Sequence, residues 1–235
     1  MKALNRTAEA KVYDYACDKH HVLSEFLELP CGIPSHDTLK RVFRRLNPAQ
    51  LETLLTNWGK DIASLLAQKQ LIVDGKQLRG TVEAGRKQAT VQIASVWAGK
   101  ERICLAQSQI NAKTNEIKAI PDLLKPLDIT GTVVSIDAIG CQKTITELIV
   151  DKKADYVIGL KANQDEDGLY EQVVDWFERM KPTLPADVSR DLGHGRGEKR
   201  TVWVSENLTL VDAATEWVGL KSVVCAASSR WMNGK

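Results

Sequence analysis

Long apolar runs and a charge excess of either sign are both missing from the sequence. No segment approaches the roughly 18 consecutive apolar residues that a membrane-spanning helix requires, and residues 1–21 lack the apolar core of a secretory signal. We therefore expect a cytoplasmic protein with no membrane partner. The 32 Lys and Arg against 30 Asp and Glu give a net charge of +2, which identifies no partner by itself. An apolar fraction of 43% with 26% charged residues excludes a disordered chain.

Paired cysteines are also lacking. The five cysteines are scattered and include no C-x-x-C pair, which indicates reduced thiols in a reducing compartment and no disulfide framework. Cys17, His20, His21 and Cys31 are zinc-ligating residue types, but their spacing matches no standard zinc finger. The preferred interpretation is buried thiols and surface imidazoles.

Residues 1–69 have the pattern of helices, and we assign them to an N-terminal helical segment. Ser35 is a suitable N-cap for a helix whose apolar positions follow the i, i+3, i+4, i+7 spacing. These positions are Leu39, Val42, Phe43 and Leu46. A second apolar helix face extends over residues 51–66.

From residue 70 to residue 235, short β-branched segments indicate a second domain. The predicted order is three strands, then helix, strand, helix, strand and helix. Because the later strands alternate with helices, crossover connections place them parallel in one sheet, which makes the fold class α/β with a mixed sheet. The strands are expected at residues 71–74, 90–97, 102–108, 132–137 and 155–160.

A linker and further strands are predicted after the last of these helices. Residues 180–199 contain several Gly, Pro and charged residues, as is typical of a linker. Residues 201–204, 207–211 and 222–228 have the composition of strands.

Two aspartates occupy equivalent places in the predicted sheet. Asp74 ends the first strand and Asp137 ends the fourth, each after apolar residues and before a turn of small residues. Two carboxylates brought side by side repel each other unless a divalent cation lies between them, and Mg²⁺ or Mn²⁺ prefers oxygen ligands. A pair of such metals can activate a water or hydroxyl and stabilise the leaving oxygen in phosphodiester transfer. The alternative is that each aspartate caps a turn or a helix.

Four segments carry a family resemblance around these aspartates: LIVDGKQLRGT, VSIDAIGCQK, ADYVIGLKANQ and GHGRGEKR. They resemble, in the same order, signature segments of DDE transposases from bacterial insertion sequences, in the H-repeat-associated (ISAs-type) family. KTNEIKAIPDLLKPLDITG and GIPSHDTLKRVFRRLNP extend the resemblance over nearly the whole chain.

The resemblance implies a ribonuclease-H-like catalytic domain, preceded by a small helical segment and followed by a partial β insertion. In it, Asp74 and Asp137 match the first two acids of a metal-binding triad. The implied cofactors are Mg²⁺ or Mn²⁺ at a two-metal site, and the implied partners are transposon terminal repeats, target DNA and a second copy in a homodimer. The predicted strand order agrees independently, because it places the first acid on the first strand and the second acid on the fourth.

The family's third acid is a glutamate in a segment resembling H-W-x-I-E-N, which this sequence lacks. Glu198 is the first substitute, because its spacing from Asp137 (198 minus 137, or 61) nearly repeats that of the first pair (137 minus 74, or 63). It leads directly into a predicted strand, and in the family this segment precedes the third acid. Glu171 is a second substitute, on a predicted helix whose opposite side carries the apolar stripe. That stripe consists of Leu169, Val173, Trp176, Phe177 and Met180. The side of Glu171 is therefore better interpreted as solvated surface.

Two other departures from the family pattern bear on activity. Gln92 stands where the family usually has a histidine, and an N-terminal D-P-R segment is absent. The chain therefore looks shortened at both ends, and we expect a truncated transposase that is inactive or weakly active.

Basic residues accompany the predicted site. Lys76 and Arg79 follow Asp74, and Lys161 follows the strand next to that of Asp137. Such groups contact DNA phosphates, with solvated loop residues as the alternative. A denser basic segment either clamps DNA or keeps a glycine-rich loop soluble. Its residues are His194, Arg196, Lys199 and Arg200.

The leading functional hypothesis is an insertion-sequence transposase that cleaves and joins DNA with bound metal ions. The alternatives are a non-catalytic DNA-binding or regulatory transposase remnant, and a metal-dependent nuclease on the same fold. Strand transfer by the purified protein distinguishes the first from the other two.

Overall fold

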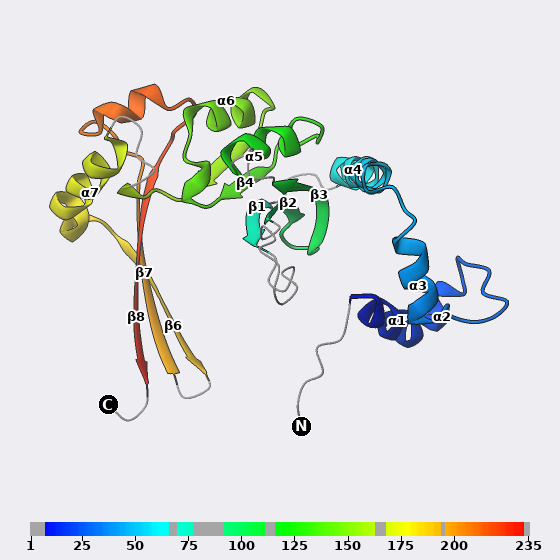
Figure 1. The fold of residues 1–235 in the computed structure, drawn as a ribbon. Helices are drawn as coiled ribbons and strands as arrows, with labels where there is room; N and C mark the ends of the chain where they lie inside the picture. The colour runs from blue at the N-terminus through cyan, green and yellow to red at the C-terminus, as the bar shows by residue number, and fades with distance from the viewer. Residues whose placement is uncertain are drawn as a thin grey trace, which may run out of the picture. The chain divides into compact units, whose positions relative to one another are not determined.

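The structure of the chain is a computed structural model that describes residues 8–65, 70–77, 92–110, 116–162, 168–193 and 196–232. Contacts divide the chain into two compact units, residues 1–54 and 55–235. The boundary between the units falls within helix α4 (Pro48–Leu65), and Figure 1 labels the helices and strands of both. Among the described helices, none combines the length and apolarity needed to cross a bilayer.

The first unit is helical, as predicted. It contains α1 (Ala8–Asp18), α2 (His20–Leu23) and α3 (His36–Phe43), and α1 contacts α3. Ser35 caps α3, because its side-chain oxygen accepts a hydrogen bond from the backbone N–H of Thr38 at 3.3 Å. The apolar stripe of α3 is half-exposed rather than buried, with Val42 at 50% and Phe43 at 46% exposure.

A five-stranded mixed sheet forms the centre of the second unit. Its strands are β1 (Gln70–Gln77), β2 (Gln92–Ala98), β3 (Ile103–Ile110), β4 (Val133–Ile136) and β5 (Asp155–Ile158). The order across the sheet is β3-β2-β1-β4-β5. The β1–β2 and β2–β3 pairs are antiparallel, whereas β1–β4 and β4–β5 are parallel. The predicted meander and the two parallel crossover strands are therefore confirmed.

One face of this sheet is covered by α5 (Glu116–Leu124) and α6 (Lys143–Asp151). Along β1 and β4 the buried residues alternate, as the two-residue period of a strand requires. They include Leu71 and Val73 of β1, Val134 and Ile136 of β4, Ile120 and Leu124 of α5, and Ile145 and Ile149 of α6. The opposite face of the sheet is partly exposed, since Ile72, Trp97, Val133 and Val157 are all accessible there.

A second sheet follows helix α7 (Leu169–Met180). Its strands β6 (Ala186–Gly193), β7 (Arg196–Ser205) and β8 (Val223–Met232) are antiparallel in the order β6-β7-β8. Figure 1 shows them as a long ribbon that extends away from the helices on the five-stranded sheet. The apolar stripe predicted for α7 is confirmed and packs with residues of the η4 (Asp212–Glu216) region and β8. The buried members of this cluster include Leu169, Val173, Trp176, Phe177, Val211, Trp217 and Val223.

Two predictions for this region are wrong. Residues 180–199 are not a linker, because they contain the whole of β6 and the start of β7. Residues 207–211 are not a strand: the Asn207 side chain accepts hydrogen bonds from the N–H and hydroxyl of Thr209, which stabilises a turn. Val211, which follows this turn, is buried in the core with α7 although it is not part of a strand.

Candidate functional site

Asp74 and Asp137 lie side by side on neighbouring parallel strands. Val73 is the register partner of Ile136, so the two aspartates are the next residues along β1 and after β4. The prediction that Asp74 ends its strand is wrong, because β1 stays paired with β2 as far as Gln77. Adjacent strands are about 4.8 Å apart. Because Val73 and Ile136 point into the core, alternation directs both aspartates to the opposite face, where both are exposed. The structure thus brings together the two carboxylates that the sequence singled out.

The backbone around Asp137 holds its carboxylate at the end of β4. One carboxylate oxygen accepts a hydrogen bond from the Ile139 N–H at 3.1 Å and so caps the short helix η1 (Ala138–Gly140). On the neighbouring strand, Gly159 donates its N–H to the carbonyl of Ile136 at 3.0 Å. A Cβ atom at Gly159 would lie only 3.0 Å from the Ala138 nitrogen. The turn-capping interpretation of Asp137 is therefore correct for one carboxylate oxygen. A carboxylate has a second acceptor oxygen, with which Asp137 can coordinate a cation.

Two of the predicted phosphate-contacting lysines lie near this edge. Lys76 is on β1 two residues after Asp74, so it shares the face of that aspartate, and its side chain is exposed. Lys161 follows β5 by three residues and is exposed as well. Arg79 lies outside the described residues.

Glu198 lies on the other sheet. It is within β7, opposite Asp191 of β6 and Arg230 of β8. Its carboxylate accepts a hydrogen bond from Arg200 Nε at 2.8 Å, and Arg230 Nη2 lies 3.6 Å from the same oxygen. The hydrogen bond from Arg200 is the main reason that the pKa of Glu198 is lowered. The structure does not bring Glu198 to the two aspartates, so its role as third acid stays a prediction.

The other residues considered from the sequence are dispersed. Glu171 is exposed on α7, and Gln92 begins β2 opposite Gln77. Within the described ranges, no three His, Cys, Asp or Glu side chains are arranged to hold a metal ion.

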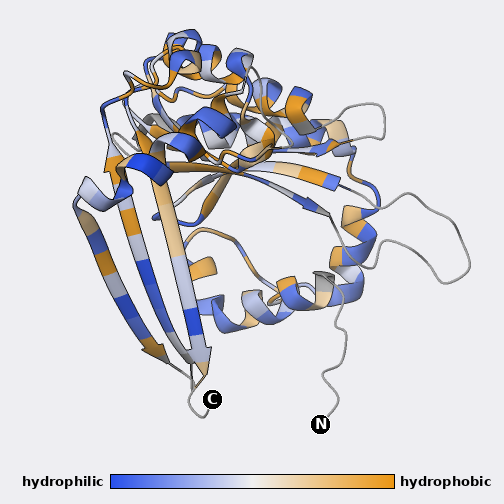
Figure 2. Ribbon diagram, turned by 90° about the vertical axis from the view of Figure 1, so that its left-hand side faces the viewer, coloured by the Kyte–Doolittle hydropathy of each residue, from blue (hydrophilic) through white to orange (hydrophobic). Residues whose placement is uncertain are grey.

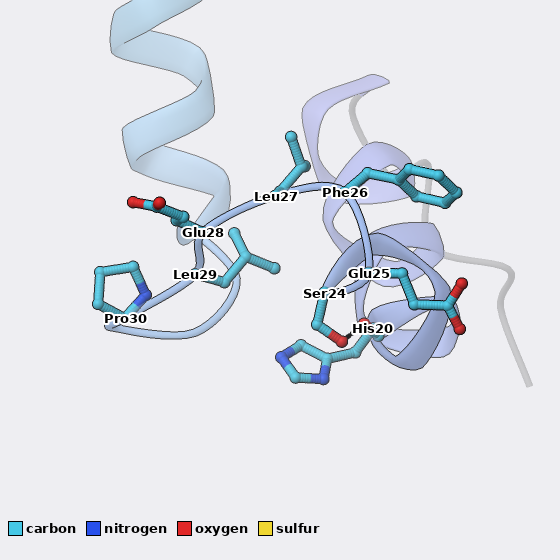
Figure 3. Close-up of a pocket in the computed structure, with 8 residues that line it drawn as sticks. All are labelled: His20, Ser24, Glu25, Phe26, Leu27, Glu28, Leu29 and Pro30. Carbon is cyan, nitrogen blue, oxygen red and sulfur yellow. Dashed lines mark hydrogen bonds between the residues drawn. The ribbon is translucent and has the colours of Figure 1, made fainter.

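The N-terminal cysteines and histidines are surface residues. Cys17 and Cys31 are exposed, so the prediction of buried thiols is wrong for them, whereas Cys141 is buried. A hollow of about 600 Å³ lies beside α2, and Figure 3 shows the residues that line it. It is lined by His20, Ser24, Glu25, Phe26, Leu27, Glu28, Leu29 and Pro30. The Ser24 hydroxyl there donates to the His20 carbonyl oxygen at 2.8 Å, which is a local helix-end bond.

The basic segment GHGRGEKR (residues 193–200) contributes its first residue to β6 and its last five to β7. Arg196 is the first residue of β7, while His194 lies outside the described residues. Lys199 and Arg200 are neighbours on β7, so their side chains point to opposite faces of the sheet. Arg190 of β6 is the register partner of Lys199. Sequence reasoning missed Arg190 because the segment was interpreted as a linker.

The five-stranded order β3-β2-β1-β4-β5, with aspartates at the adjacent ends of the parallel β1–β4 ladder, is the arrangement of a ribonuclease-H-like transposase fold. Residues 66–231 match the family described as "Transposase DDE domain", and residues 5–59 match the family described as "DDE_Tnp_1-associated". The chain belongs to the DDE transposase family and is of the H-repeat-associated type.

Similar proteins carry transposase names. "Putative transposase YncI" of Escherichia coli O157:H7 is 32% identical over 94% of this chain and 57% of its own length. "H repeat-associated putative transposase YhhI" of Escherichia coli K12 is 32% identical over 88% of this chain and 56% of its own length. The chain thus spans little more than half of these two relatives. A piggyBac transposase synaptic complex with hairpin DNA aligns with a TM-score of 0.38 at 12% identity, over 85% of this chain and 45% of that chain.

Proposed function

We propose that this chain acts in metal-dependent DNA strand cleavage and transfer during insertion-sequence transposition, with Asp74 and Asp137 holding a divalent cation. The observation that carries the proposal is the β1–β4 register, which sets the two exposed carboxylates side by side on one face. Membership of the transposase family supports the same reaction.

The chemistry of the donors fits Mg²⁺ or Mn²⁺. Both ligands are carboxylates, both are exposed, and they lie on adjacent strands about 4.8 Å apart. Without a cation, ionised carboxylates this close repel each other. A bound divalent ion supplies Lewis-acid stabilisation of phosphoryl oxygens and lowers the pKa of a coordinated water.

The residues around the aspartates have separate roles in this proposal. Asp74, within β1, and Asp137, directly after β4, hold the cation on a rigid sheet, and the turn that Asp137 caps orients its carboxylate. Lys76 and Lys161, both exposed, hold DNA phosphates near that edge and position the strand to be cut. The proposed substrates are transposon terminal repeats and target DNA. A homodimer and a cytoplasmic location belong to the same proposal.

A strand-transfer assay tests the proposal. Purified protein is incubated with terminal-repeat DNA, target DNA and Mg²⁺ or Mn²⁺, and joined products are resolved on a denaturing gel. We expect weak joining at most, because no third carboxylate of the described residues joins the two aspartates, and we expect Asp74→Asn and Asp137→Asn each to abolish it. Asp122→Asn, which removes an exposed carboxylate from α5, is the matched control and keeps activity.

The other outcomes separate the alternative functions. Cleavage without joining, lost in both aspartate variants, replaces the transposase proposal with a metal-dependent nuclease. DNA binding without cleavage, unchanged in both variants, replaces it with a non-catalytic DNA-binding transposase remnant.

A further inference from the structure

The described carboxylates of strands β6, β7 and β8 all lie on one face of their sheet. In an antiparallel sheet, directly opposed residues share a face, and successive residues along a strand alternate between faces. The register pairs Asp191 with Glu198 and Glu198 with Arg230. Asp187, opposite Val202, is on the same face. We call this the paired face, defined by Asp187, Asp191, Glu198, Arg200 and Arg230.

The opposite face has no carboxylate among the described residues of the three strands. The same register pairs place Arg190 with Lys199, and Lys199 with Ser229. We call it the acid-free face, defined by Arg190, Leu192, Lys199, Thr201, Ser229 and Trp231. Near the other end of the sheet this face continues into the core with α7, through Trp203 and Val223.

The cations of the two faces differ in their partners. On the paired face, Arg200 and Arg230 both contact the Glu198 carboxylate. On the acid-free face, neither Arg190 nor Lys199 has a carboxylate of the described residues within ion-pair distance. Like charges directly opposite each other destabilise a sheet. Placing two cations opposite each other, with the described carboxylates of these strands on the far face, favours an external anion.

Trp231 lies over Gly197 on the acid-free face. A Cβ atom at Gly197 would overlap the indole, nearest to Cε2 and then to Cζ2 and Nε1. If the indole met the glycine with its edge, Nε1 and Cζ2 would be nearer to the added Cβ than Cε2, the ring-fusion carbon between them. Because Cε2 is the nearest atom, the ring covers the glycine with its flat side. Trp231 is nevertheless 40% exposed. Its inner ring face covers the backbone, and its outer ring face is accessible.

We propose that the acid-free face binds a DNA strand, with phosphates on Arg190 and Lys199 and an unpaired base stacked on the outer face of Trp231. The combination of a cationic track with an accessible aromatic ring is the chemistry that recognises single-stranded nucleic acid. An unpaired base is specified because duplex bases keep their faces stacked on one another. This inference rests on the proposed function, since it assigns part of the DNA substrate to a second surface.

Salt-dependent binding tests the two cations. A fluorescent single-stranded oligonucleotide and a blunt duplex of the same sequence are titrated with the full chain by fluorescence anisotropy at several salt concentrations. We expect Arg190→Ala and Lys199→Ala each to weaken binding and to lower the salt slope by about 0.7 for the single strand. Arg230→Gln removes an exposed cation from the paired face and is the matched control, for which we expect an unchanged slope.

Substitution of Trp231 tests the stacking. Trp231→Leu keeps an apolar cover over Gly197 but removes the ring, and we expect it to weaken single-strand binding roughly tenfold while leaving the blunt duplex unaffected. Trp231→Phe keeps a ring and retains most of the affinity. Circular dichroism establishes that each variant is folded.

The outcomes distinguish this inference from the proposed function. Equal affinity and equal slope in wild type, Arg190→Ala and Lys199→Ala, with strand transfer intact, overturn the assignment of this face alone. Wild-type affinity in Trp231→Leu overturns the stacking. Absence of binding to either DNA by the wild-type chain overturns this inference, whereas absence of strand transfer bears only on the catalytic proposal.

Discussion

Gly59 of α4 lies directly against the backbone of Leu105 in β3. A Cβ atom at position 59 would overlap the Leu105 carbonyl oxygen. Gly59 is buried, and Ile62, one turn further along α4, packs against the core of the five-stranded sheet. Since β3 is the outermost described strand of that sheet, the missing side chain lets α4 rest on its edge.

Replacing this glycine is expected to destabilise the second unit. Gly59→Ala gains about 1 kcal/mol of helix propensity, but the new methyl group forces α4 away from the β3 backbone, and overpacking of this kind costs roughly 1–3 kcal/mol. Rigid backbone atoms cannot yield as a side chain can, so we expect a net loss in the free energy of unfolding, measured by urea denaturation. Asn57→Ala raises helix propensity at an exposed position of the same helix and should not destabilise. An equal or higher stability for Gly59→Ala would show that α4 does not dock on β3.

The N-cap of α3 provides a prediction for the first unit. Ser35→Ala removes the acceptor for the Thr38 N–H and is expected to cost about 1 kcal/mol. Hydrogen exchange of the Thr38 amide should accelerate, while Ser35→Asp should keep it protected because the aspartate side chain also caps. Unchanged exchange in Ser35→Ala would mean that the hydroxyl does not stabilise this helix.

The sequence was most informative where residues are buried. The five strands of the central sheet and the stripe of α7 were predicted because their apolar periodicity reflects a core on one side. Strand β6 was missed because both of its faces are largely exposed, and Arg190 interrupts the alternation of Ala186, Val188 and Leu192 with polar residues. Its strand conformation depends on pairing with β7, which no local pattern in β6 records.

The site was predictable to the same extent. Asp74 and Asp137 could be identified because each follows buried apolar residues of a strand, and parallel pairing of β1 with β4 brings them together. Glu198, Lys199 and Arg200 could be selected from the sequence as candidate site residues, but the face on which each lies depends on the register between β6, β7 and β8. Arg190 and Trp231 could be found from the sequence only after β6 and β8 were aligned with β7.

Tyr156 gives a prediction for alkaline pH. Its hydroxyl donates to the Val218 carbonyl oxygen at 3.0 Å, and burial raises its pKa from 10.0 to about 12. Between pH 10 and 12 the folded state therefore holds a proton that the unfolded state has released, so stability falls as pH rises through this range. Below pH 10 both states are protonated, and the phenol contributes its full stabilisation.

The matched variant is Tyr156→Phe. At neutral pH it loses one hydrogen bond and should be about 1 kcal/mol less stable than wild type. That difference should shrink as the pH rises above 10, because only the wild type must release the phenolic proton. Urea denaturation of both proteins at a series of pH values measures the difference directly. A difference that stays constant up to pH 12 would contradict the raised pKa.

We expect metal binding to depend on Asp137 but not on Glu198. The Glu198 carboxylate already contacts Arg200 and Arg230, and its lowered pKa reflects the hydrogen bond from Arg200. Metal coordination by Glu198 would have to replace these partners, whereas Asp137 has the neighbouring Asp74 carboxylate on the same face.

In calorimetric titrations with Mn²⁺, we expect Glu198→Gln to keep the wild-type Kd and Asp137→Asn to weaken binding by at least roughly tenfold. Asp191→Asn, which removes the carboxylate opposite Glu198, serves as the control for charge on that face. If Glu198→Gln weakens Mn²⁺ binding as strongly as Asp137→Asn, then Glu198 is the third ligand, and the β6–β8 sheet must move relative to the central sheet when the metal binds.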